Sequence, residues 1–89
     1  MNYMNTVKFP EYKQRITEAI EQKIRTVPIA GENGFTIIDG FIMQPISGEV
    51  SGNITIGGPT VPLVAIVGNT SGRIYYFALK ALGIHGLEI

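Results

Sequence analysis

The sequence predicts a small α+β domain in which one helix precedes an antiparallel sheet of four strands. Between residues 10 and 26, apolar side chains recur at intervals of three and four, as in an amphipathic helix. From residue 35 onward, stretches rich in Ile, Val, Phe and Tyr alternate with Gly- and Pro-rich turns at about ten-residue spacing, which is typical of antiparallel strands. The 89 residues suffice for one domain, 1–89, and are too few for two separate cores.

The helix is expected over residues 10–26. Pro10 suits its first turn, where a backbone N–H has no partner within the helix, and Pro28 is expected to end it. Residues 1–9 would form a loose arm and residues 83–89 a tail. The apolar stripe that should pack against the sheet consists of Tyr12, Ile16, Ala19, Ile20 and Ile24.

The four strands are expected to form an antiparallel meander, with Gly- and Pro-rich turns between them. The last strand has an alternative, because the apolar residues of 74–82 also fit a helical stripe. The run Ile74-Tyr75-Tyr76-Phe77 favours a strand. The many glycines would also allow the sheet to curl into a partial barrel, which would need a contribution from the N-terminal arm. The predicted strands cover residues 35–43, 49–56, 61–67 and 73–79.

Two of these strands are apolar on both faces, which is the main functional signal in the sequence. A sheet with one exposed face should show alternating apolar and polar residues, but residues 61–67 and 73–79 do not. One helix can cover only one face, so we expect the other face to contact a second copy of the chain or another protein. The expected interface residues are Ile37, Phe41, Val61, Leu63, Tyr75 and Phe77.

Composition argues against several other classes of function. Seven basic and seven acidic residues give zero net charge, so no basic excess attracts nucleic acid or an anionic membrane. The absence of cysteine excludes disulfides and thiolate metal sites. No apolar run has the length of a signal peptide or of a membrane span, so we expect a cytoplasmic protein without a membrane partner.

Candidate catalytic and ligand-binding residues are few, and we expect neither a cofactor nor a metal. Asp39-Gly40 resembles the aspartate of a dimeric aspartic protease only weakly, because no hydroxyl residue separates the two. The Gly68–Arg73 segment (GNTSGR) lacks the spacing and the lysine of a phosphate-binding loop and is interpreted as a hairpin turn. His85 has no neighbouring residues that could complete a metal site.

The leading hypothesis is therefore a non-enzymatic module that forms homo-oligomers, dimers or higher, or binds a protein partner. One alternative is a small-ligand-binding domain with a pocket between helix and sheet, lined by apolar residues and one or two tyrosines. A less favoured alternative is a dimeric hydrolase that uses Asp39. An aromatic platform for nucleic-acid bases at Tyr75, Tyr76 and Phe77 is disfavoured, because it lacks a basic groove.

Overall fold

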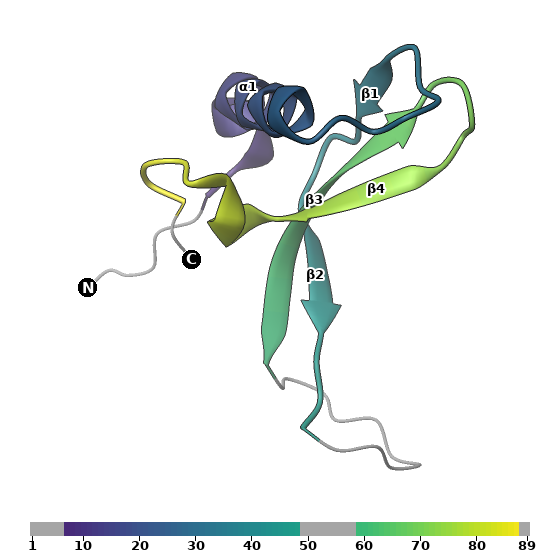
Figure 1. Ribbon diagram of the computed structural model, residues 1–89. Coiled ribbons are helices and arrows are strands. Elements are labelled where there is room, and N and C mark those ends of the chain that lie inside the picture. The colour runs from purple at the N-terminus through teal and green to yellow at the C-terminus, as the bar shows by residue number, and fades with distance from the viewer. Residues whose placement is uncertain (1–6, 49–58, 88–89) are drawn as a thin grey trace.

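The computed structural model describes residues 7–48 and 59–87. Helix α1 (Phe9–Thr26) precedes four strands and a 3-10 helix, η1 (Leu79–Leu82). The predicted α+β class, one helix followed by a four-stranded antiparallel sheet, is thereby confirmed (Figure 1). The strands are β1 (Phe35–Ile37), β2 (Ile42–Pro45), β3 (Thr60–Gly68) and β4 (Ile74–Ala78).

Strand β3 is the centre of the sheet, because every other strand pairs with it. β1 and β2 lie one beyond the other along the same side of β3, and β4 pairs with its opposite side. All of these pairings are antiparallel. The sheet is open and does not close into the partial barrel that the glycines would have allowed. The strand predicted over residues 49–56 lies outside the described residues.

The strand predicted over residues 35–43 is divided into β1 and β2 by a bulge. Ile37 lies opposite Ile66 and Ile42 opposite Leu63, so the four residues between the two strands lie opposite only two residues of β3. Gly40, within the bulge, has a φ of 152°, which residues with a side chain rarely adopt. The bulge adds two residues relative to β3, and an even number of extra residues leaves alternate side chains on the same faces before and after it. The sequence pattern therefore does not reveal the break.

The last predicted strand forms as β4, and the alternative of a helix over residues 74–82 is wrong for its first half. The strand ends at Ala78, and the single turn η1 follows directly. η1 ends at Gly83, whose φ of 69° is readily adopted only by glycine. Leu79 and Leu82 of this turn are buried, so the segment after β4 turns back under α1.

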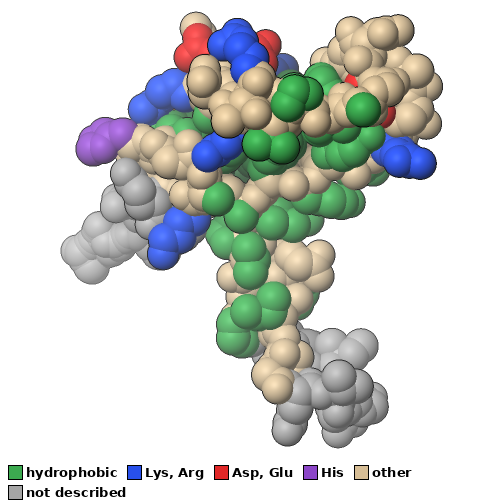
Figure 2. All heavy atoms as spheres, viewed as in Figure 1, with side chains coloured by type: hydrophobic (Ala, Val, Ile, Leu, Met, Phe, Trp, Pro, Cys, Tyr) green, Lys and Arg blue, Asp and Glu red, His purple; other side chains and the backbone are tan. Residues whose placement is uncertain are grey.

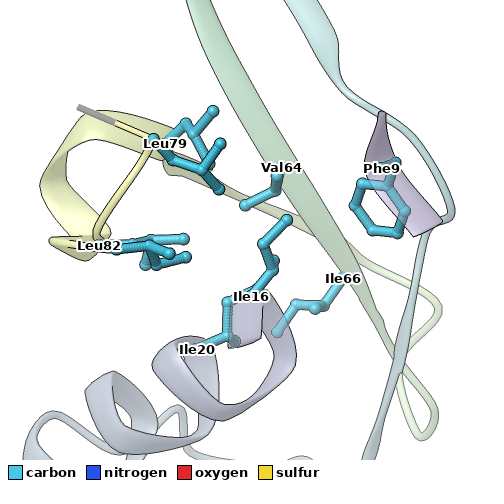
Figure 3. Packing of buried hydrophobic residues seen from close by; sticks show 9 residues of the cluster. Phe9, Ile16, Ile20, Val64, Ile66, Leu79 and Leu82 are labelled. Carbon is cyan, nitrogen blue, oxygen red and sulfur yellow. The ribbon is translucent and has the colours of Figure 1, made fainter. Parts of the chain in front are cut away.

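The hydrophobic core lies between α1 and one face of the sheet. Ile16 and Ile20 of the helix point toward Val64 and Ile66 of β3 (Figure 3). The segment after Gly83, expected to be a tail, instead contributes two buried residues to this core. These are Ile84 and Leu87.

Shortening a core side chain should destabilise the fold measurably. Ile16→Val removes one methyl group from a fully buried position and should lower the free energy of unfolding by about 0.5–1.5 kcal/mol. Val27→Ala, at an exposed position, serves as control and should change it by less than about 0.5 kcal/mol. Urea denaturation followed by circular dichroism measures both values, and equal effects would contradict this core assignment.

Candidate functional site

The face of the sheet opposite α1 is mostly apolar, and no element in the described part of the chain packs against it. Alternate residues of a strand point to opposite faces. The helix side holds Val64 and Ile66, so their neighbours in β3 and the residues paired with those neighbours face away from α1. We call this surface the open face. It consists of Thr36, Ile42, Leu63, Ala65, Val67, Ile74, Tyr76 and Ala78.

The most exposed large side chains of the open face both lie on β4, the edge strand. Ile74 is 49% exposed and Tyr76 is 56% exposed. Leu63 and Val67, on the central strand, are only partly exposed, and Ala65 is buried between its neighbours. Exposure therefore increases from the middle of the open face toward the β4 edge.

The interface residues predicted from sequence do not share one surface. Four of them pack against the core on the helix side, namely Ile37, Phe41, Tyr75 and Phe77. The Phe41 ring meets the Phe9 ring edge to face, with 5.3 Å between centroids. The other two, Val61 and Leu63, have the opposite orientation. This division depends on which face of the sheet α1 covers. A strand that is apolar on both faces does not show in its sequence which face that will be.

A two-stranded arm projects from the helix-covered part of the sheet (Figure 1). β4 pairs with β3 only from Leu63 onward, so β3 residues 60–62 have β2 as their only strand neighbour among the described residues. Hydrophobic side chains line this arm (Figure 2). Met43 is 54% exposed and Ile46, just after β2, is 52% exposed. Isolated two-stranded ribbons are marginally stable in water, so this arm would gain stability from an apolar contact.

A cluster around Glu32 joins the turn before β1 to the turn between β3 and β4. Its carboxylate accepts hydrogen bonds from the Thr70 and Ser71 backbone N–H groups, both at 3.2 Å, and from the Ser71 hydroxyl. The Tyr75 hydroxyl also donates to it, at 2.7 Å. Gly68 allows this approach, because a Cβ there would collide with the carboxylate. The Thr70 and Ser71 donors of the GNTSGR turn thus bind the chain's own Glu32, consistent with the interpretation of this segment as a structural turn.

The hydrogen bonds lower the pKa of Glu32 from its ordinary 4.5 to about 2. The Ser71 hydroxyl has the largest effect, followed by the Tyr75 hydroxyl and then the two backbone N–H groups. The sequence does not indicate this role of Glu32, because its partners lie about forty positions away. A lone glutamate in a Gly-Asn turn offers no local signal that would have identified it.

An apolar groove of about 710 Å³ lies between the C-terminal half of α1 and the β4–η1 segment. Ala19 and Val27 line the helix side, and Phe77 and Ala81 line the other. Lys23 is the charged residue of its lining. The volume is within the usual range for small-molecule sites. The groove contains no tyrosine, in contrast to the pocket expected from the sequence.

The remaining candidates have ordinary surface environments. The Asp39 carboxylate is 67% exposed and forms an ion pair with Lys13, at 2.9 Å. The His85 backbone carbonyl accepts a hydrogen bond from Arg15. Tyr75 and Tyr76 point to opposite faces of the sheet and form no common stacking platform. No group of metal-binding side chains occurs among residues 7–48 and 59–87.

Comparison of this chain with protein-family models, curated proteins and solved structures finds no match. No helix within the described ranges is long and apolar enough to cross a membrane. The open face, the arm and the groove are therefore the features of the described chain that bear on function.

The Glu32 cluster should make stability depend on pH in the acid range. Because its pKa is lowered in the folded protein, Glu32 stabilises the fold above pH 4.5, and this contribution is lost as the pH falls toward 2. Glu32→Gln should reduce the fall in stability over that interval, whereas Glu21→Gln, on the exposed surface of α1, should not. Urea midpoints at pH 5 and pH 2.5 measure the difference. An unchanged acid dependence in Glu32→Gln would contradict the assigned role.

Proposed function

We propose that the protein is a non-enzymatic module that associates with further copies of itself through the open face of its sheet. The observation that carries this proposal is the apolar composition of the open face, with Ile74 and Tyr76 about half exposed. The closest alternative within this class is association with a different protein over the same surface.

The size of the open face supports this role. With strands about 4.8 Å apart and a rise of about 3.3 Å per residue, it presents on the order of 300 Å² of projected surface. Apolar patches of this size are the largest found on ordinary monomers and often mark interaction sites. The apolar arm adds a second surface that water solvates poorly.

Charge also favours association over repulsion. The net charge of the chain is zero, so two copies meet without long-range repulsion. The open face itself carries no charged side chain. Desolvating it therefore carries no cost for unpaired charges.

The groove between α1 and β4–η1 supports a second candidate function, binding of a small apolar ligand. Its apolar lining and its volume of about 710 Å³ are the specific observations in favour. Lys23 would suit a ligand with an anionic group. The hydrolase hypothesis has no comparable support, because Asp39 is exposed and paired with Lys13.

Self-association can be measured by light scattering after size exclusion. At micromolar concentration the wild-type chain should have a mass of at least twice 9.7 kDa. Tyr76→Lys, which places a charge on the open face, should weaken association at least about tenfold, because burying an unpaired charge is costly.

Gln14→Lys adds the same charge to the exposed surface of α1 and is the matched control. It should assemble like the wild type, and circular dichroism should show that both variants are folded. A wild-type chain that remains monomeric at micromolar concentration would refute the proposal.

Ligand binding in the groove can be measured with the anionic apolar dye 8-anilinonaphthalene-1-sulfonate. Ala81→Trp fills the groove from an exposed position and should lower dye affinity at least about tenfold. Tyr76→Lys alters the open face and should leave dye binding in the groove unchanged. Equal dye affinity in the wild type and Ala81→Trp would exclude the groove as the binding site.

A further inference from the structure

We infer that two copies of the chain join edge to edge along β4, in antiparallel orientation, with a two-fold axis at Tyr76. This inference rests on the proposed self-association and specifies its geometry.

One backbone edge of β4 has no partner strand among the described residues. The Gly68 N–H points toward β4, because it donates to the Arg73 carbonyl at 2.8 Å, and the Ala65 carbonyl points the other way, accepting from Ile38. Hydrogen-bonding direction alternates along a strand, so Tyr75 and Phe77 bond to β3. The outward-facing N–H and C=O groups of β4 are then those of Ile74, Tyr76 and Ala78.

No described strand pairs with these outward groups. Exposed edges are usually protected by charged residues, proline or a bulge. β4 has the sequence IYYFA and contains none of these, whereas β2 on the other side of the sheet ends in Pro45. β4 is therefore the edge that is best suited to accept another strand.

A two-fold axis at Tyr76 makes this edge complementary to itself. Tyr76 then lies opposite the partner's Tyr76, and Ile74 lies opposite the partner's Ala78. Each outward group of β4 meets an outward group of the second copy, and any shift in register leaves some of them unpaired. The edge cations avoid each other, because Arg73 falls opposite the partner's Leu79 and Lys80 opposite the partner's Gly72.

Edge pairing also accounts for where exposure concentrates on the open face. Directly opposite residues in antiparallel strands have Cβ atoms about 4.5–5.5 Å apart, so their side chains pack together. The two tyrosine rings would lie side by side, and Ile74 would pack on the partner's Ala78. The two half-exposed residues of the open face thus become covered, and the two open faces join into one continuous surface.

Cysteine cross-linking tests this geometry directly, because the natural chain contains no cysteine. Opposite residues of a hydrogen-bonded antiparallel pair have Cα atoms about 5.5 Å apart, within the range of about 4.4–6.8 Å for a disulfide. Under mild oxidation, most molecules of Tyr76→Cys should therefore form a disulfide-linked dimer. Leu63→Cys, on the same face but on the central strand, and Gln14→Cys, on α1, should remain uncross-linked.

A second experiment retains Tyr76 and tests the register. Ile74→Cys and Ala78→Cys should each cross-link poorly alone but should form a mixed covalent dimer when combined, since the proposed register places these positions opposite each other. Light scattering of the wild type, measured under the same conditions, shows whether the chain self-associates.

The outcomes separate the two proposals. If the wild type associates but only Leu63→Cys cross-links, the copies stack face to face and edge pairing is overturned. Association with no cross-link in Tyr76→Cys or in the mixed pair also overturns it. A monomeric wild type instead refutes self-association itself, and the edge pairing with it.

Discussion

The packing of α1 against one face of β3 is the constraint on which the rest of this structure depends. Ile16 and Ile20 meet Val64 and Ile66, and the buried residues of η1 and of the C-terminal segment gather around the same contact. The strand is apolar on both faces, but the described part of the chain offers a single α-helix to cover it. Because α1 covers one face, the other face remains an apolar surface, and its removal from water by a binding partner would be favourable.

The ends of the sheet are organised differently. Near the turns, Glu32 accepts hydrogen bonds from the 70–71 backbone and from Ser71 and Tyr75, which joins β1 to the β3–β4 hairpin. At the opposite end, beyond the bulge between β1 and β2, the two-stranded arm extends away from the helix-covered region (Figure 1). Hydrophobic side chains line this arm (Figure 2). One end is thus closed by polar contacts, and the other presents an apolar surface.

These features underlie the proposed role as an interaction module. The described carboxylates of Glu18, Glu32 and Asp39 all contact other groups of the chain. The surfaces without described partners are the open face, the arm and the groove, and all three are mostly apolar. Because hydrophobic association is non-directional, the specific geometry of an assembly would come from the hydrogen-bonding edge of β4.

The sequence by itself determined the helix, the antiparallel class and the positions of β3 and β4, because the 3.6-residue and two-residue periodicities are local properties. It also indicated excess apolar sheet surface for a single helix. Only the tertiary structure decided that Tyr75 and Phe77 face the helix whereas Tyr76 faces outward, that Ile84 and Leu87 complete the core, and that Glu32 joins distant turns. These features depend on contacts between residues far apart in the chain, and a two-faced apolar strand has no pattern that distinguishes its buried side from its exposed side.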